Sequence, residues 1–377
     1  MSTHKLLSLA LLLFTSYPAL TAPVPVMNFR AGSESYTVEK IVDGFGGIWA
    51  LEFLSPNTII FNEINGAIST LNLSSGVTRV MKNPPKVYFE GQGGLLDIAV
   101  DPNFESNQYI YVTYSKKVGE LQTTAMARSQ LDLEKESFSP WVDLFVAKPA
   151  SSTSHHYGSR IAFDKGGHIF FTVGERGNAD LAQSLKAHNG KVIRLNLDGS
   201  VPSDNPFVRT PSALKEIWSY GHRNPQGIFF DETSNTLYEQ EHGPMGGDEI
   251  NIVGKGKNYG WPVISFGVDY SGRPVGNGER TRPGMEQAIK YFVPSIAPSS
   301  MMIYRGDKLK LFKDKFVSGS LALQHLNLVS VKDVYDACED RLLLKLNERI
   351  RDVKEGPDQL VYVASDNGRI YVIKPGK

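Results

Sequence analysis

The chain has 377 residues, and its 40 lysines and arginines balance 40 aspartates and glutamates, so the formal net charge is zero. No long basic run and no acidic tail is present, which argues against a nucleic-acid partner. The length allows one large all-β domain or two ordinary domains, and 35 scattered glycines with 21 prolines are typical of short strands joined by turns.

The N-terminus has the features of an export signal. Lys5 gives a weakly positive start, Leu6 to Phe14 is apolar, and small residues near Ala19 to Ala22 suit a cleavage site. A buried N-terminal helix is the alternative, but Pro23 and Pro25 follow at once. We therefore expect a signal peptide at residues 1–22, a mature domain at 23–377 and no transmembrane segment, because the apolar run is too short to span a bilayer.

Cysteine usage bears on the compartment. Cys338 is the only cysteine, so the chain cannot form an intramolecular disulfide. An exported protein without disulfides fits a bacterial periplasm better than a disulfide-stapled secreted module. We expect a periplasmic or secreted protein.

A loose pattern recurs along the chain: an alternating apolar strand, a turn containing Pro, Asp, Asn or Gly, and a second strand rich in aromatic or β-branched residues. Such copies recur every few tens of residues, with room for four short strands each. They predict a single-domain, all-β, six-bladed β-propeller, with a pair of β-sandwiches as the alternative. The fifth copy is blurred. The copies cover residues 49–61, 97–114, 160–173, 227–238, 300–323 and 351–373.

The stretch from Glu216 to Pro262 concentrates charged and amide side chains between glycines and prolines. Short apolar runs inside it, such as Ile228 to Phe230, are predicted strands, so the polar clusters fall on loops. Loops held by a rigid scaffold commonly carry binding and catalytic groups. We interpret this stretch as the floor of an active site.

Motifs of common hydrolases, nucleotide-binding proteins and zinc proteases are missing. The chain has no G-x-S-x-G, no Walker loop, no G-x-G-x-x-G and no H-E-x-x-H. His155 and His156 are adjacent, and on a strand they would point to opposite faces, so one metal could not hold both. Zinc is not expected.

A histidine and a carboxylate lie at the edges of the strands predicted for the third repeat. His156 precedes the first strand and Glu175 follows the second. A carboxylate beside a histidine fixes the tautomer of the ring and raises its basicity, which suits a general base. Taken alone, such a pair is more often a structural hydrogen bond. A glycine-rich segment around Gln92 is a further candidate.

Eight motifs together carry a resemblance to a known family. From about Gly46 to the C-terminus the chain closely resembles the soluble pyrroloquinoline-quinone (PQQ)-dependent aldose (glucose/sorbosone) dehydrogenases, and the motifs come in the order of that family. They are GQGGLLD at Gly91, H-x-G-x-R at His156, G-[DE]-R-G at Gly174, SYGHRNPQG at Ser219, EHGPxGGDEIN at Glu241, NYGWP at Asn258, PSIAPSS at Pro294 and RIRDVxxGPD at Arg349.

The resemblance implies a six-bladed propeller and assigns roles to residues of this chain. His156 matches the general base, Glu175 matches its carboxylate partner (usually Asp), and Arg223 matches the cation that stabilises negative charge on the quinone oxygens. The remaining implied PQQ contacts are Gln92, Asn224, Tyr270, Arg349 and Arg351, with Arg223 again among them.

The family also uses calcium, which takes oxygen ligands. The resemblance implies that the carbonyls of Gly243 and Pro244 hold a Ca²⁺ beside the quinone, although the residues alone would favour an ordinary turn. A second, structural Ca²⁺ would use Glu249 and the carbonyl of Tyr259.

Two departures from the family pattern concern the surroundings of the pocket. Residues 320–323 contain no lysine where some glucose-specialised members carry one, which places the chain nearer the broad-specificity aldose branch. Ser159 stands where a glycine is usual beside the base. Neither departure removes a group that the implied chemistry needs.

The resemblance implies an enzyme that oxidises an aldose to a lactone and passes the electrons through PQQ to an external acceptor. The alternative is a non-catalytic β-propeller that recognises a protein or a sugar, as in animal proteins resembling hedgehog-interacting protein. Those relatives lack the complete set of cofactor residues, which this chain keeps. The sequence leaves the natural sugar, the acceptor and the choice between monomer and homodimer open.

Overall fold

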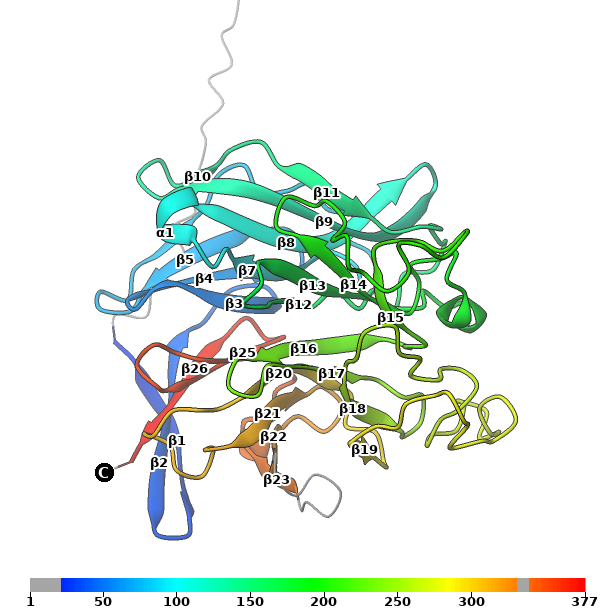
Figure 1. Cartoon of the computed structure of the whole chain (residues 1–377). Coiled ribbons are helices and arrows are strands. Elements are labelled where there is room, and N and C mark those ends of the chain that lie inside the picture. The colour runs from blue at the N-terminus through cyan, green and yellow to red at the C-terminus, as the bar shows by residue number, and fades with distance from the viewer. Residues whose placement is uncertain (1–21, 331–338, 377) are drawn as a thin grey trace, which may run out of the picture.

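The computed structural model describes residues 22–330 and 339–376 and consists almost entirely of antiparallel strands (Figure 1). Three short helical turns interrupt them: α1 (Phe104–Asn107), η1 (Ala179–Gln183) and η2 (Leu344–Leu346). None of the helices in this described part is long and apolar enough to cross a membrane. Cys338 and the predicted signal peptide, except its last residue, lie outside the described residues.

The first three sheets follow one another along the chain, and each is a blade of consecutive strands. Each strand pairs with its sequence neighbours, except that β11 pairs with β9 and not with β10. They are blade 1 with β3 (Ile48–Ser55), β4 (Thr58–Glu63), β5 (Ile68–Asn72) and β6 (Thr78–Val80); blade 2 with β7 (Leu95–Val100), β8 (Tyr109–Val118), β9 (Leu121–Asp132), β10 (Ser137–Phe138) and β11 (Val142–Val146); and blade 3 with β12 (Ile161–Phe163), β13 (His168–Val173), β14 (Lys191–Asn196) and β15 (Ile217–Tyr220).

The last three sheets repeat this plan, except that the final one gathers strands from both ends of the chain. They are blade 4 with β16 (Pro225–Asp231), β17 (Thr236–Glu241), β18 (Asp248–Ile252) and β19 (Lys290–Phe292); blade 5 with β20 (Pro298–Ile303), β21 (Lys315–Ser320), β22 (Leu326–Ser330) and β23 (Glu339–Leu342); and blade 6 with β24 (Ile350–Glu355), β25 (Val361–Ser365), β26 (Ile370–Pro375), β2 (Glu34–Val42) and β1 (Val24–Ala31).

The hydrophobic core is divided among the interfaces between blades. Within the described residues, six buried clusters each join one pair of neighbouring blades, and blade 6 packs against blade 1 through Tyr362 and Phe61. A single blade cannot cover both of its faces, so the ring must close to bury them. The prediction of a six-bladed β-propeller is confirmed.

Closure of the ring was not predicted from the sequence. β2 pairs with β26, with Val38 opposite Ile373, so an N-terminal strand completes the C-terminal blade. In Figure 1 the blue hairpin of β1 and β2 lies beside the red strand β26. A turn next to this blade requires glycine: Gly368 has φ +74°, and a Cβ there would lie 1.9 Å from the carbonyl oxygen of Phe45.

Candidate active site

A cavity of about 580 Å³ lies at the end of the propeller axis where the innermost strands β3, β7, β16 and β24 begin. Loops and strand ends from different blades meet there, so residues far apart in the sequence face one space. The cavity is lined by Gly47, Trp49, Ile64, Phe89, Gly91, Gln92, Leu96, Tyr157, Gly158, Asn224, Gln226, His242, Ala297, Leu321, Arg349, Arg351 and Asp366.

His156 and Glu175 meet beside this cavity. His156 lies in the loop before β12 rather than on a strand, in a left-handed conformation with φ +56°. Its Nδ1 is 2.6 Å from Glu175 Oε1, and its backbone N–H donates to Gln92 Oε1 at 2.9 Å. The extra methylene of glutamate, relative to the family's usual aspartate, therefore still permits the hydrogen bond.

The electrostatics of the pair favour a neutral His156 ring hydrogen-bonded to an ionised Glu175 carboxylate. Burial lowers the pKa of His156, although the hydrogen bond that its Nδ1–H donates to Glu175 opposes this shift. Burial raises the pKa of Glu175, but the contact with His156 and the charge of Arg223 outweigh it, and the net pKa is lowered. With Nδ1–H donated to Glu175, Nε2 retains its lone pair and can accept a proton.

Arg223 and Asn224 enter from the loop before β16. The Arg223 Nη1 donates to the carbonyls of His242 at 3.2 Å and Gly243 at 3.0 Å, and the guanidinium lies 5.2 Å from the Trp261 ring centre. The Arg223 carbonyl accepts from the Glu175 N–H at 2.8 Å, which ties this loop to the loop carrying Glu175. Asn224 Oδ1 accepts from the Gly158 N–H at 3.1 Å.

Arg349 and Arg351 form a cationic wall on the blade 6 side. Arg351 Nε lies 2.7 Å from Asp366 Oδ1, and Arg349 Nε lies 2.8 Å from Asp366 Oδ2, so one carboxylate holds both side chains. The two guanidiniums lower the pKa of Asp366 against its burial, which keeps it ionised. Two cations against one anion leave this wall with net positive charge.

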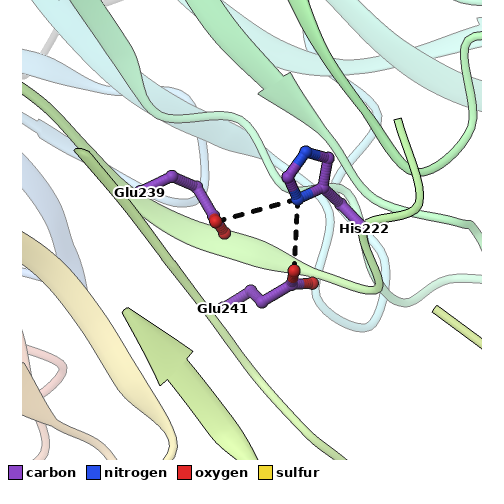
Figure 2. Close-up of side chains that lie close together, drawn as sticks. All are labelled: His222, Glu239 and Glu241. Atoms are coloured by element: carbon purple, nitrogen blue, oxygen red, sulfur yellow. Dashed lines mark hydrogen bonds and ion pairs between the residues drawn. The ribbon is translucent and has the colours of Figure 1, made fainter. Parts of the chain in front are cut away.

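A second group of polar residues lies behind Arg223 in blade 4. His222, Glu239 and Glu241 are buried, and one ligand atom from each lies within 4.8 Å of the others (Figure 2). His222 Nδ1 is 3.1 Å from Glu241 Oε1 and 3.7 Å from Glu239 Oε2. These three residues were missed in the sequence; the signal was the alternation Glu239-x-Glu241, which puts both carboxylates on one face of β17.

Glu249 joins this group from the neighbouring strand. It lies opposite Glu241 in the register of β17 and β18, and Asn251 Nδ2 donates to both Glu239 and Glu249. Burial and the charge of Glu241 raise the pKa of Glu249 to about 8. We call His222, Glu239, Glu241 and Glu249 the carboxylate cluster.

A small space of about 10 Å³ adjoins the carboxylate cluster and is lined in part by Glu241, Glu249, Tyr259 and Gly243. A space of this size holds about one water-sized particle. Glu239 Oε1 and Asn251 Oδ1 are buried without a hydrogen-bond partner among the described residues. The cluster and the neighbouring Asn251 therefore offer spare oxygen ligands, and two of the carboxylates, Glu241 and Glu249, border the small space.

Of the predicted site residues, Gln92, Asn224, Arg349 and Arg351 line the large cavity itself, whereas Tyr270 and Pro244 line neither it nor the small space beside the carboxylate cluster. Tyr270 is 73% exposed, on the loop after Val268, and is not among the cavity-lining residues. Pro244 lines neither the large cavity nor the small space beside the carboxylate cluster, whereas its neighbour Gly243 lines that small space. The aromatic side chain at the cavity mouth is Phe89, which is 58% exposed.

Comparisons with known proteins agree with this arrangement. A family model described as Glucose / Sorbosone dehydrogenase matches residues 46–372. The aldose sugar dehydrogenase YliI of Escherichia coli (strain K12) is 37% identical over 352 residues, covering 92% of this chain and 94% of that protein. Quinoprotein glucose dehydrogenase B of Acinetobacter calcoaceticus is 27% identical over 453 residues, covering 97% and 94% respectively.

Among solved structures, the apo-form of the soluble aldose sugar dehydrogenase from Escherichia coli has a TM-score of 0.86 at 35% identity. The match covers 90% of this chain and 99% of that chain. The likeness therefore extends over nearly the whole ring of blades.

Proposed function

The chain belongs to the glucose/sorbosone dehydrogenase family, and from this premise we propose that it is an exported, PQQ-dependent enzyme that oxidises aldoses at the anomeric carbon to lactones. Family membership makes it an oxidoreductase acting on sugars. The quinone, the calcium, the product and the periplasmic or secreted location are parts of the proposal. Its main support is the His156–Glu175 pair beside a cavity with a cationic wall.

The residues divide the work of the proposed reaction. His156 Nε2 accepts the proton of the anomeric hydroxyl, and Glu175 holds the ring in the tautomer that leaves Nε2 free. Glu175 also stabilises the imidazolium that results, because its carboxylate stays ionised 2.6 Å away. Arg223 places a fixed positive charge at the edge of the site, where it would stabilise negative charge on the oxygens of the bound quinone.

The cavity residues fit an aromatic quinone that carries carboxylates. Arg349 and Arg351 present guanidinium groups suited to carboxylates, and the Trp49 ring gives the cavity a flat apolar surface. When bound, the quinone supplies the two-electron acceptor for the hydride that leaves the sugar carbon. A similar protein is named a quinoprotein, which supports the same cofactor. An external acceptor must then reoxidise it.

The carboxylate cluster fits a calcium ion. Ca²⁺ takes six to eight oxygen ligands. The cluster supplies three carboxylates, and unpartnered oxygens remain on Glu239 and on the neighbouring Asn251. Glu249 was expected as a ligand from the sequence, and Glu239 and Glu241 extend the set. The separate Ca²⁺ implied at the carbonyls of Gly243 and Pro244 would act as a Lewis acid; in the structure the Gly243 carbonyl accepts from Arg223 at 3.0 Å.

The pH dependence of turnover follows from the lowered pKa of His156. We expect the acid limb of kcat/KM to lie below pH 6.5, because the ring loses its lone pair only as pH falls through its lowered pKa. In Glu175→Gln the limb should move to still lower pH and the plateau should fall, since Glu175 raises the pKa of His156. Rates measured from pH 4.5 to 9 test this. A limb above pH 6.5, or one unmoved by Glu175→Gln, would assign it to another group.

Reconstitution tests the proposed function directly. The mature chain, purified without cofactor, is mixed with PQQ with and without Ca²⁺, and reduction of an artificial dye is followed across a panel of aldoses. We expect dye reduction that requires both PQQ and Ca²⁺. If PQQ binds but no aldose reduces it, the proposed substrate class is wrong. If a folded chain binds no PQQ, the non-catalytic propeller becomes the better reading.

A further inference from the structure

Arg160 lies on the propeller axis beneath the cavity, four residues after His156 and directly before β12. Its side chain is buried, and the residue is 3% exposed. Nη1 donates to Asp97 Oδ1 at 2.8 Å and lies 3.3 Å from Asp352 Oδ1. Two buried carboxylates from blades 2 and 6 thus flank one guanidinium from blade 3.

The other donors of Arg160 reach three backbone carbonyls, on β16, β3 and β24. Nε donates to the carbonyl of Gln226 at 3.1 Å, and Nη2 donates to those of Trp49 at 3.2 Å and Arg351 at 2.7 Å. The guanidinium also stacks on the Trp49 ring at 4.0 Å. A guanidinium has five N–H donors. Four of them make these hydrogen bonds, and Nη1, which carries the fifth, lies 3.3 Å from the Asp352 carboxylate. One side chain joins five of the six blades.

These acceptors belong to the walls of the cavity. Trp49, Gln226 and Arg351 line it directly, and Gln226 in turn donates to the carbonyl of Gly158, two residues after His156. The loop bearing the proposed base and the strand bearing the cationic wall therefore meet at the same guanidinium. Among the described residues, no other hydrogen bond links the loop of His156 directly to the strand of Arg351 at the axis.

We infer that Arg160 is a positioning residue that fixes the loop of His156 against the quinone-binding strand of Arg351. The inference rests on the proposed function for its link to the quinone. Its geometric part, the joining of the blades 1, 2, 3, 4 and 6 at the cavity floor, does not. Lysine cannot replace this role, because an ammonium keeps the charge but offers three donors from a single point.

Arg194 provides a matched control in the same blade. It is also buried, at 6% exposure, its Nη1 donates to Asp204 Oδ1 at 2.8 Å, and it stacks on Trp218 at 4.8 Å. Its contacts stay within blade 3 and the loops of that blade. Arg160→Lys and Arg194→Lys therefore each remove the guanidinium contacts of a buried arginine, one at the axis and one away from it, with the difference that the Arg194 partner Asp204 is itself 60% exposed.

The test compares the two variants by hydrogen exchange without PQQ and by PQQ titration. In Arg160→Lys we expect amide protection to fall together in residues 156–161, 225–228 and 350–353, and the PQQ Kd to rise at least tenfold. In Arg194→Lys we expect protection to fall only within blade 3 and the PQQ Kd to stay within twofold, whatever the loss in Tm.

Two outcomes would overturn the inference: protection lost only around residue 160, or an equal change of Kd in both variants. If Arg160→Lys does not fold, Asp97→Asn, which weakens one of the five contacts, should give the same pattern on a smaller scale, and its absence counts against the role. If the wild-type chain binds no PQQ, the proposed function fails, while the exchange data still decide whether Arg160 couples the blades.

Discussion

Replacing His156 by glutamine is expected to lower kcat with aldoses by about 10²- to 10⁴-fold, the usual contribution of a general base. Glutamine approximates the size of the ring but cannot accept the hydroxyl proton. The backbone N–H of residue 156 still reaches Gln92, and the cationic wall of Arg349 and Arg351 is untouched. The PQQ Kd should therefore stay within about threefold. Dye-reduction kinetics and a quinone titration measure the two quantities separately.

His155 gives the control for this variant. It is the adjacent residue on the same loop, and its ring contacts that of His156 edge-on, with centroids 4.6 Å apart. His155→Gln alters the same segment without removing the proposed base, so its kcat should remain within a few-fold of the wild type. Wild-type turnover in His156→Gln, or an equal loss in both variants, would remove His156 from the role of base.

Calcium is expected to stabilise the folded chain through the carboxylate cluster. An ion that binds only the folded state adds about 2.7 kcal/mol to the free energy of unfolding at 100 times its Kd, which raises Tm by several degrees. Glu239→Gln should lose most of this gain because it removes a ligand charge. Without calcium the same variant should be more stable than the wild type, since burial and the neighbouring charge of Glu241 disfavour the ionised Glu239.

Thermal unfolding in a calcium buffer and in a chelator measures both effects. Glu348→Gln is the control, because Glu348 is also buried but is bonded to Arg369 and Tyr371 in blade 6. This variant should lose stability in both conditions and keep the full calcium gain. If calcium raises the Tm of Glu239→Gln as much as that of the wild type, the ion binds elsewhere.

The propeller and most of the cavity could be predicted because their signals are local. Each strand–turn–strand copy fits within a few tens of residues, and Asn224, Gln92 and Arg351 stand in short motifs that the loops deliver intact to one end of the axis. Tyr270, which lies outside the eight motifs, was assigned to the pocket by the resemblance alone, and the position of its loop depends on tertiary packing. It lies 73% exposed, outside the cavity lining.

What escaped prediction depends on pairings between distant residues. The sequence of the closing strand β2 does not indicate that its partner is β26, because Val38 and Ile373 become neighbours only in the folded ring. The carboxylate cluster forms because strand register sets Glu241 opposite Glu249. Arg160 is part of a recognised motif, but its five contacts come from other blades. Local pattern cannot supply such register and closure.

On the proposed function, the closure of blade 6 also governs when a newly made chain can acquire the quinone. β2 is among the first segments synthesised and β26 the last, so the ring can close only after the entire chain has emerged. Arg351 lies on β24 of that same blade, and the cationic wall therefore reaches its final place at closure. Binding of the quinone is then one of the last steps in making the protein. We expect a chain cut short before β26 to keep most of the cavity residues but not to assemble them into a site that binds the quinone.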